Sequence, residues 1–385
     1  RTHITPTAMR KPACRRRFWH RGFWRRYWRA KSRSPEVHVA NEALDAFCGF
    51  SVTSTPGALV LTEAELQKLR QDCHLMRERH DASSFFLSVA DARVVLSEPS
   101  PPAMLAYVAE LLLEELRREI ARDSSLKPKL RTSGAEFWVQ RRSRSDAINW
   151  HWDKDERLRD ACDVVVHPLV STVTYLSSGG APTVVLDAHV SSEGTLRAPL
   201  GEADAFRARS ATSERAPSAA ATDPPRMAAT VSYPRSRKLL RFSGRLLHGC
   251  PAALAEPIEG GSERTTLLVN VWLNHVPLGL KRLPHSTARR LRCRAPHPLL
   301  RLPVDQMAPP AVTLPWARGR GAEAQAAMIP LHVPVCEGSH VLRVSLPPAP
   351  LGDWAGGPRS EDGGRAVGDG TATYEGVPVG VSSGG

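Results

Sequence analysis

The stretch that decides the fold and chemistry of this chain reads Ile148-Asn149-Trp150-His151-Trp152-Asp153-Lys154-Asp155-Glu156. In an extended segment, side chains two residues apart leave the same face, so we expect His151 and Asp153 to project together while Trp152 points the other way. One imidazole beside one carboxylate supplies two ligands of a three-ligand metal site. The sequence therefore predicts a third ligand, a histidine, much further along the chain.

The candidate for the third ligand is His248, in the segment Ser243-Gly244-Arg245-Leu246-Leu247-His248-Gly249-Cys250-Pro251. Its neighbour Gly249 has no side chain and would let a ligand approach closely. A histidine in such apolar company can instead be an ordinary core residue. Beside His151 and Asp153, however, it completes a set of two histidines and one carboxylate. Such a set suits non-haem Fe(II) with three open coordination positions, and it also suits zinc.

Arg264 is a candidate anchor for a ligand that carries a carboxylate. It is the first basic residue after His248, so no Lys or Arg competes within that interval. The planar guanidinium of arginine pairs bidentately with a carboxylate, and Thr266 shares its strand face and can add a hydroxyl. The alternative is a surface ion pair between Arg264 and Glu263. Its position after the three candidate ligands favours an anchor for a dicarboxylate.

The middle of the chain has the pattern of a mainly β protein with flanking helices. Short segments rich in β-branched and aromatic residues, separated by Gly, Pro and Ser turns, predict an antiparallel sandwich or barrel. The predicted strands are 136–141, 163–166, 172–176, 183–186, 238–242 and 265–273.

Two amphipathic helices are expected before the strands, where they would brace one face of the sheet. The first begins at a capping box of Thr62 and Glu65, and the second has Ser100 as its cap and Pro101 in its first turn. Their apolar stripes comprise Leu66, Leu69, Cys73 and Met76 in the first helix and Leu105, Val108, Leu112, Leu116 and Ile120 in the second.

The basic character of the chain is concentrated at its N-terminus. Lys and Arg outnumber Asp and Glu by 52 to 39, yet the first thirty-five residues hold twelve Lys and Arg and no acid, which leaves the remainder at about +1. Such an Arg-rich, acid-free arm is typical of an organelle-targeting or disordered segment. Because its arginines are interleaved with aromatic residues, it can also bind nucleic acid or a membrane surface.

Composition divides the chain into one core with supporting segments. We expect a basic arm at 1–36, helical support at 37–132, a β core at 133–280 with a mobile insertion at 191–229, an extension at 281–351 and a disordered Gly-rich tail at 352–385. Within the extension, 328–335 and 340–346 can pair as two strands.

Seven scattered cysteines without a Cys-x-x-Cys pair predict reduced thiols in an intracellular setting. No stretch approaches the roughly twenty apolar residues of a transmembrane helix, so a soluble protein is expected.

The order His151-x-Asp153, His248, Arg264 resembles the signature of the Fe(II)- and 2-oxoglutarate-dependent dioxygenases, and in particular the prolyl 4-hydroxylase-like branch. The segment 172–176, followed by two glycines and a threonine, resembles the strand and Gly-Gly-x-Thr turn of that branch, with one extra residue. The phrase His-Gly-Cys-Pro at 248–251 resembles the surroundings of its distal histidine. The similarity covers roughly residues 136–273, and it implies a double-stranded β-helix of the jelly-roll or cupin-like kind, with iron at one open end.

The resemblance also implies the cofactors and the reaction. His151, Asp153 and His248 would hold Fe(II), while Arg264 and Thr266 would hold the far carboxylate of 2-oxoglutarate; O2 is the second co-substrate and ascorbate a further candidate cofactor. The reaction would hydroxylate a peptidyl (prolyl-like) or small-molecule substrate with release of succinate and CO2.

Two departures from that branch affect the co-substrate site. Arg142 stands at the place where a tyrosine commonly helps to hold 2-oxoglutarate, and residues 255–261 lengthen the interval between His248 and Arg264.

Two alternative functions stay open at this point. The first is an oxygenase that demethylates nucleic-acid bases and uses the basic arm to grip the strand. The second is a non-catalytic β-helix module in which the two histidines and the aspartate bind zinc structurally.

Overall fold

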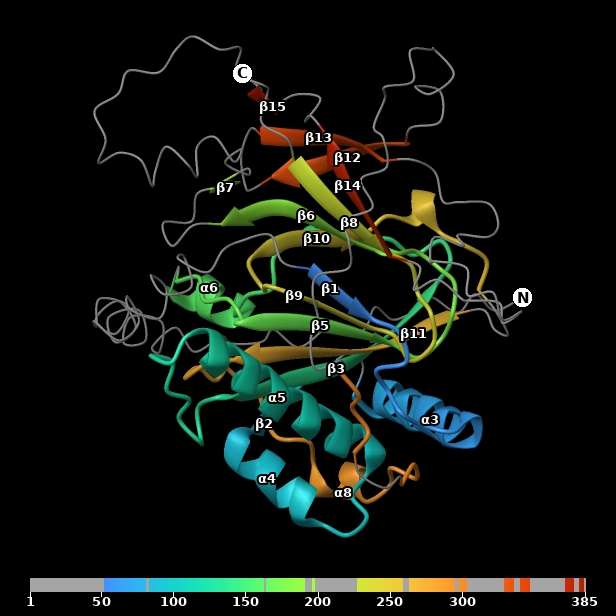
Figure 1. The fold of residues 1–385 in the computed structure, drawn as a ribbon, viewed down its shortest axis with the longest axis vertical. Helices are drawn as coiled ribbons and strands as arrows, with labels where there is room; N and C mark the ends of the chain where they lie inside the picture. Colours follow the sequence, from blue (N-terminus) through green and yellow to red (C-terminus); the bar gives the residue numbers. More distant parts are fainter. Residues whose placement is uncertain are drawn as a thin grey trace, which may run out of the picture.

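The computed structural model describes residues 52–80, 83–162, 164–190, 196–197, 227–258, 263–294, 298–302, 329–335, 340–346, 371–376 and 381–383. Two antiparallel sheets face each other, one with six strands on a single path and one with five strands on its main path and β7 beside them, and helices cover the outer side of the first, which we call the larger sheet (Figure 1). The larger sheet has the order β1 (Val52–Thr55), β9 (Leu239–Phe242), β5 (Val170–Tyr175), β11 (Glu263–Trp272), β3 (Gly134–Ser143) and β2 (Phe85–Ser88). The main path of the second sheet has the order β14 (Thr371–Gly376), β8 (Met227–Ser232), β6 (Thr183–Val190), β10 (Leu246–Cys250) and β4 (Ile148–His151).

The order in which the chain crosses between the sheets defines the fold. Leaving aside β7 (Leu196–Arg197), which pairs with β6 at its edge, the eight strands from β3 to β11 form two groups of four. The set β9-β5-β11-β3 lies in one sheet and the set β8-β6-β10-β4 in the other, with every pairing antiparallel. This alternation is that of a double-stranded β-helix, the jelly-roll arrangement that joins two antiparallel sheets by Greek-key crossings. The predicted fold class is confirmed.

Side chains of β11 alternate between the two faces of the larger sheet. Leu267, Val269 and Val271 are fully buried in the core that the sheet shares with the helices. The opposite face points into the barrel, where Leu268 packs against a second cluster that contains Val173 and Phe242. Because strand side chains have a period of two, one strand supplies both the structural core and the wall of an interior cavity.

Two long helices cover the outer face of the larger sheet, as expected. The first, α3 (Glu63–His80), begins with the predicted capping box: the Thr62 backbone N–H donates to Glu65 Oε2 at 2.8 Å, and the Glu65 N–H donates to Thr62 Oγ1 at 3.3 Å. Its predicted apolar stripe is buried. The second, α5 (Ala103–Arg122), packs beside it, with α4 (Val89–Ser97) completing the layer. Shorter helices are α6 (Glu156–Cys162), η1 (Ala252–Leu254) and α8 (His285–Ala288).

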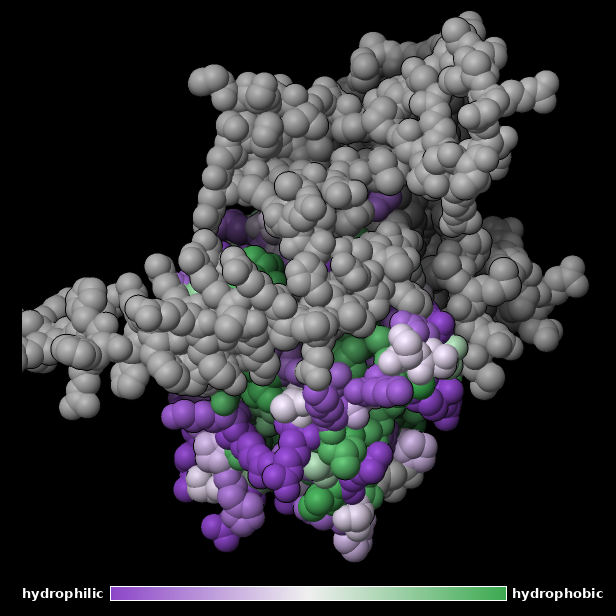
Figure 2. Space-filling view, turned by 90° about the vertical axis from the view of Figure 1, so that its left-hand side faces the viewer, coloured by the Kyte–Doolittle hydropathy of each residue, from purple (hydrophilic) through white to green (hydrophobic). Residues whose placement is uncertain are grey.

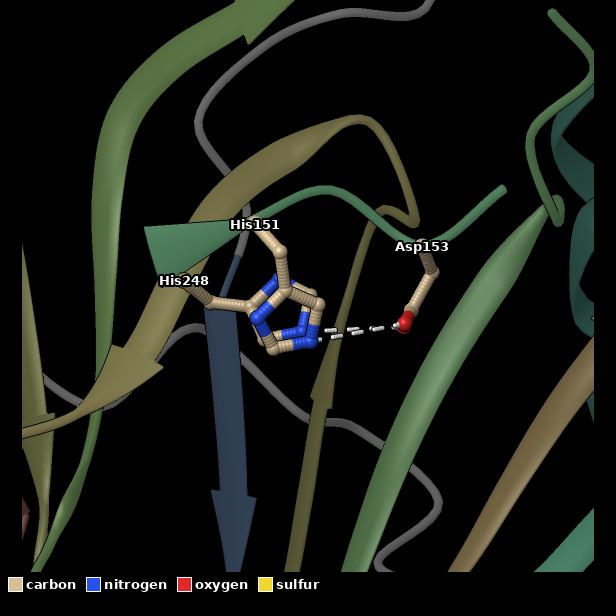
Figure 3. A group of neighbouring side chains, drawn as sticks. All are labelled: His151, Asp153 and His248. Atoms are coloured by element: carbon tan, nitrogen blue, oxygen red, sulfur yellow. Dashed lines mark ion pairs between the residues drawn. The ribbon is translucent and has the colours of Figure 1, made fainter. Parts of the chain in front are cut away.

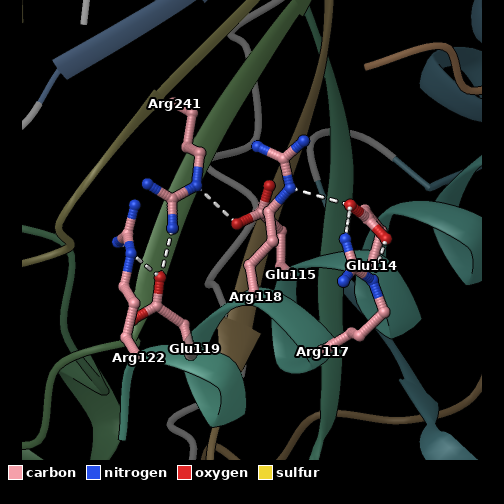
Figure 4. Close-up of polar contacts among 7 residues, drawn as sticks. All are labelled: Glu114, Glu115, Arg117, Arg118, Glu119, Arg122 and Arg241. Carbon is pink, nitrogen blue, oxygen red and sulfur yellow. Dashed lines mark hydrogen bonds and ion pairs between the residues drawn. The ribbon is translucent and has the colours of Figure 1, made fainter. Parts of the chain in front are cut away.

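A buried ion-pair cluster fastens α5 to β9 (Figure 4). The guanidinium of Arg241, on the helix-facing side of β9, donates to Glu115 and Glu119 on α5. Arg241 and both glutamates are buried. Toward the surface, Arg122 donates to Glu119 at 2.9 Å. The orientation of the helix on the sheet is therefore set by charge pairing in addition to apolar contact.

Several expectations about secondary structure need correction. Residues 164–166 form no strand; the Val166 carbonyl instead accepts the Asp155 N–H at 3.0 Å, and Pro168 follows. The N-cap of α5 is Pro102, without a side-chain hydrogen bond, and Ile120 is 37% exposed. The segment 37–132 is not purely helical, because β1 and β2 extend the larger sheet at both edges.

The C-terminal regions show both agreement and disagreement with expectation. The strands β12 (Ile329–Val335) and β13 (His340–Leu346) pair as predicted, with β15 (Val381–Ser383) beside them. Disorder does not hold for the whole tail, since β14 and β15 fall within it; the Thr and Tyr residues of β14 favour a strand that pairs with β8. The insertion 191–229 likewise contains β7 and the start of β8. The basic arm lies outside the described residues.

The described surface is mixed in character. Over the helix-bearing part of the molecule, hydrophilic side chains surround a group of hydrophobic ones (Figure 2). Large hydrophobic side chains that are exposed comprise Val60, Val94, Ile120, Leu130 and Val276. Within the described ranges, no helix has the length and apolar character that crossing a membrane would require.

Candidate metal centre

The two candidate histidine ligands lie on neighbouring strands of the smaller sheet. His151 ends β4 and is directly opposite His248 on β10, where a register shift follows before Cys250. Their ring centroids are 4.3 Å apart with an interplanar angle of 54°. Strand pairing, which joins residues 97 positions apart in sequence, therefore brings both imidazoles to one point inside the mouth of the barrel (Figure 3).

Asp153 completes the group from the loop after β4. Its Oδ1 lies 3.9 Å from His151 Nε2 and its Oδ2 lies 3.7 Å from His248 Nε2. These distances are too long for hydrogen bonds. One potential ligand atom from each of the three side chains lies within 4.8 Å of the others, so the structure brings the three candidate residues together.

Backbone hydrogen bonds fix the tautomers of both histidines. His151 Nδ1 lies 2.7 Å from the carbonyl oxygen of Asn149, and His248 Nδ1 lies 2.9 Å from that of Leu246. Because a carbonyl oxygen only accepts, each Nδ1 carries the proton and donates it, which leaves the Nε2 lone pair directed at the centre. Burial lowers the pKa of His248 to about 4, so its imidazole is neutral near pH 7. Two imidazole nitrogens and a carboxylate that face one another are a donor set that fits a divalent metal ion.

Two further residues hold Asp153 in place, and no local sequence pattern indicates either of them. Ser171 on β5 donates its hydroxyl to Asp153 Oδ2 at 2.7 Å. His167 Nδ1 lies 2.7 Å from the Asp153 carbonyl oxygen, to which it donates. Both contacts come from residues distant in sequence. Two residues on, the buried Asp155 carboxylate receives the Leu278 N–H at 2.7 Å and contacts His275 Nε2 at 2.9 Å, which anchors the same loop.

A narrow cavity of about 40 Å³ connects this centre with Arg264. Its walls include all three candidate ligands together with side chains from β3, β5, β6, β9, β10 and β11. Those that matter below are Trp138, Gln140, Val173, Cys250, Arg264, Thr266 and Leu268. The predicted metal ligands and the predicted carboxylate anchor thus share one enclosed space.

Arg264 is a buried cation without a counter-charge in the described part of the chain. It is 2% exposed, and its Nη atoms contact the Ala181 carbonyl oxygen and, at 3.4 and 3.5 Å, the sulfur of Cys250. No described carboxylate pairs with it, and its Nε has no hydrogen-bond partner. The alternative of a surface ion pair with Glu263 is wrong, because Glu263 pairs with Arg141 at 2.6 Å on the other face.

Thr266 lies beside Arg264 on the same strand face, as the spacing predicted. Its side chain is fully buried, and its hydroxyl finds no hydrogen-bond partner among the described residues. Burying a hydroxyl or a guanidinium nitrogen without a partner is unfavourable. The two residues together therefore point to a polar ligand that would satisfy them.

The two glycines after β5 allow close contacts, Gly180 with Arg264 and Gly179 with Pro257. Gly179 and Gly180 have φ values of +83° and +90°, which strongly favour glycine. A Cβ on Gly180 would lie 3.2 Å from the Arg264 Cβ, and one on Gly179 would collide with the Pro257 carbonyl oxygen.

Arg142, which the sequence comparison placed where the prolyl 4-hydroxylase-like branch commonly has a tyrosine, is directly opposite Arg264 in the sheet, and its Nε is buried without a partner in the described residues.

Comparison with known proteins gives distant structural similarities. No protein-family profile and no curated protein matches the chain. A prolyl-4-hydroxylase from Pseudomonas putida is similar at 14% identity over 61% of this chain and 94% of that chain, with a TM-score of 0.31. Iron-bound HygX from Streptomyces hygroscopicus shows 18% identity over 63% and 89%, with a TM-score of 0.29. An oxidoreductase of the 2OG-Fe(II) oxygenase family from Burkholderia pseudomallei shows 12% identity over 60% and 88%, also at 0.29.

Proposed function

We propose that this chain is an Fe(II)- and 2-oxoglutarate-dependent dioxygenase that hydroxylates a peptidyl or small-molecule substrate. The observation that carries the proposal is the buried Arg264, which lacks a carboxylate partner in the described chain and lies in the same cavity as His151, Asp153 and His248. A buried guanidinium is normally paired. A dicarboxylate that spans the cavity would supply the missing partner at one end and reach the metal at the other.

Each part of the site has a defined task in this proposal. His151, Asp153 and His248 would occupy one face of the iron and leave positions for ligands. Arg264 would pair with the far carboxylate of 2-oxoglutarate, to which the Thr266 hydroxyl would donate. Bound iron would supply the oxidative decarboxylation of 2-oxoglutarate by O2 to succinate and CO2, coupled to substrate hydroxylation.

The remaining wall of the cavity would keep the co-substrate in one orientation. Val173 and Leu268 line the space between the two ends, and apolar surfaces there would limit the access of water. His151, whose side chain is 39% exposed, marks the side on which the centre opens to solvent. A substrate would approach from that side.

Substitution of Arg264 tests the proposal. If Arg264 binds the far carboxylate, Arg264→Ala leaves that group buried and unpaired, at a cost of about 3 to 5 kcal/mol, or roughly two or more orders of magnitude in the apparent constant for 2-oxoglutarate. Arg264→Lys keeps the charge but loses the planar fork, so we expect a moderate increase. Succinate release as a function of 2-oxoglutarate concentration measures both effects.

The matched control is Arg141→Ala, since Arg141 lies on the neighbouring strand but pairs with Glu263 on the opposite face. It should leave the constant for 2-oxoglutarate unchanged, and none of the three variants should change the iron content. Equal turnover of wild type and Arg264→Ala at limiting 2-oxoglutarate would overturn the proposal. Zinc in the anaerobically purified protein, with no succinate formed after iron is added, would favour the structural zinc module.

A further inference from the structure

Gln140 is a polar residue of the cavity to which the proposed function gives no task. It belongs to β3 and lines the same cavity as Arg264 and the three candidate metal ligands. Its Oε1 atom is buried, and no described residue forms a hydrogen bond with it. Burying an amide oxygen without a partner is unfavourable. Gln140 therefore has a hydrogen-bonding group to offer to a ligand inside the proposed co-substrate site.

The sheet places Gln140 directly beside the proposed carboxylate anchor. In the antiparallel pairing of β3 with β11, Gln140 is the Cα partner of Thr266, two positions along from Arg264. Side chains of directly opposite residues lie on the same face of a sheet, with Cβ atoms about 5 Å apart. The neighbours Val139 and Leu267 are buried in the core on the helix side, so Gln140 and Thr266 both point into the barrel. Two adjacent strands thus leave an amide and a hydroxyl without partners at one level of the cavity.

Gln140 also lies at the edge of the larger sheet at this level. The strand beyond β3 is β2, which pairs only with residues 134–137. No described strand therefore covers β3 beside Gln140. The smaller sheet ends with β4, whose Ile148 lines the same cavity. Thr266 is fully buried, whereas Gln140 is partly exposed, so Gln140 lies between the buried anchor and solvent.

Arg142 is the other polar residue of β3 beside the anchor. It is the Cα partner of Arg264, and its Nε has no described partner, but it does not line the cavity. A second guanidinium next to Arg264 would also place like charges side by side, which is unfavourable. Gln140 lines the cavity and brings no charge, and these two properties favour it as the further contact.

We propose that Gln140 is a further co-substrate-binding residue, whose amide N–H donates to the far carboxylate of 2-oxoglutarate together with Arg264 and Thr266. This inference rests on the proposed function of the chain. A glutamine amide donates through Nε2 and accepts through Oε1, and a half-turn of the terminal amide exchanges the two atoms. A carboxylate accepts about four hydrogen bonds, so it can receive a guanidinium, a hydroxyl and an amide at once. Gln140 also separates this carboxylate from water on the open side.

Equilibrium dialysis of labelled 2-oxoglutarate tests the proposal on the full-length protein loaded with Mn(II) without O2, where binding is measured in the absence of turnover. Gln140→Leu removes the amide at similar volume, and Gln140→Glu replaces the donor by a carboxylate of the same shape. The matched control is Gln71→Glu, which makes the same charge change at an exposed glutamine of α3 outside the cavity. Arg264→Ala is the reference for loss of the main anchor. Thermal unfolding of each variant checks that the fold is retained.

At pH 7.5 we expect Gln140→Leu to weaken 2-oxoglutarate binding about tenfold or more, since it removes a donor to a charged group. Gln140→Glu should weaken binding by about a hundredfold, since it brings two carboxylates together. Gln71→Glu should bind as the wild type does. At pH 5.5 the Gln140→Glu protein should recover affinity relative to the wild type at the same pH, because a protonated carboxyl group donates as the amide does. Loss of packing alone gives no such recovery.

Wild-type affinity in both Gln140 variants would overturn the assignment of Gln140. The same conclusion follows if the affinity of Gln140→Glu relative to the wild type is equal at both pH values. The reference variant separates this failure from that of the proposed function. If Arg264→Ala weakens binding and the Gln140 variants do not, only the assignment of Gln140 fails; if Arg264→Ala keeps wild-type affinity, the proposed function fails with it.

Discussion

The three proposed metal ligands differ in how firmly the fold holds them. The side chains of His248 and Asp153 are 9% and 13% exposed, whereas that of His151 is 39% exposed. His248 also packs against Phe242, with ring centroids 4.8 Å apart. Burial and packing restrict rotamers, so two ligands are preset and the third faces the opening through which metal and substrate would enter.

Replacing any of the three ligands by alanine should remove most of the bound iron, because two ligands rarely hold the metal in an open geometry. Metal analysis after anaerobic reconstitution measures this loss. The control is His285→Ala, an exposed histidine of α8. His167 would be a poor control, since it donates to the Asp153 backbone. Full iron content in the His248→Ala protein would show that the distal ligand has been assigned incorrectly.

Ser171 should affect metal affinity without contacting the metal. Ser171→Ala removes the hydroxyl that orients Asp153 Oδ2, and loss of such outer contacts typically weakens metal binding about 10- to 100-fold. Competition with a chelator measures the affinity. Thr174→Ala is the matched control, since it removes a buried hydroxyl of the same strand that bonds Tyr107 on the helix side. If both variants lower the affinity equally, Ser171 acts only through stability.

Glu136 should make the stability of the metal-free protein depend on pH. Burial, aided by the charges of Asp153 and Asp155, raises the pKa of Glu136 to about 7 from its ordinary value of 4.5. The folded state then binds more protons than the unfolded state between these pH values, so stability falls as pH rises and the loss is complete above pH 7. We expect Glu136→Gln to remove about 2 to 3 kcal/mol of this fall. Urea unfolding of the wild type and of Glu136→Gln at pH 4.5 and 7.5 measures this difference. An equal change in the free energy of unfolding between the two pH values in both proteins would contradict the prediction.

At the scale of secondary-structure elements, the contact between α5 and β9 depends on Arg241. Removing one partner of a buried ion pair leaves uncompensated charge, so Arg241→Ala should lower the free energy of unfolding by about 3 to 5 kcal/mol. In contrast, Arg117 pairs with Glu114 at the surface, with a side chain that is 67% exposed, and Arg117→Ala should leave the free energy of unfolding nearly unchanged. Urea denaturation compares the two. Similar values for both variants would show that the Arg241 cluster adds little beyond apolar packing.

The elements with a strong pattern could be predicted from sequence, and those shaped by tertiary contacts could not. The capping box of Thr62 and Glu65 predicted the start of α3, and runs of β-branched residues predicted β5 and β11. The strands β4 and β10 carry Trp, His and Gly in place of a regular alternation, so only their pairing defines them. Conversely, the apolar run at 164–166 has strand-like residues, but its backbone bonds to Asp155 in a loop.

At the scale of the whole molecule, the candidate site was easier to predict than its supports. His151, Asp153, His248 and Arg264 stand in a characteristic order and spacing along the chain, so they could be selected as candidates from the sequence. Ser171 looks like any strand serine, and its role appears only when β5 lies beside the loop of Asp153. Supporting contacts of this kind come from segments that meet only in the folded chain, so no local pattern reports them.

Because β4 and β10 each carry one proposed metal ligand, metal binding would also stabilise the pairing of these two strands. β4 has four residues and lies at the edge of its sheet, where β10 is its partner among the described strands. Such an edge can open locally without global unfolding, and opening would separate His151 from His248. A metal ion at a free concentration of about a hundred times its dissociation constant would raise the free energy of that opening by about 2.7 kcal/mol. Amide hydrogen exchange at residues 148–151 should therefore slow by roughly a hundredfold when metal is added, while exchange in β3 and β11 stays unchanged. The metal ion would then stabilise the edge strand of the smaller sheet in addition to its part in the reaction.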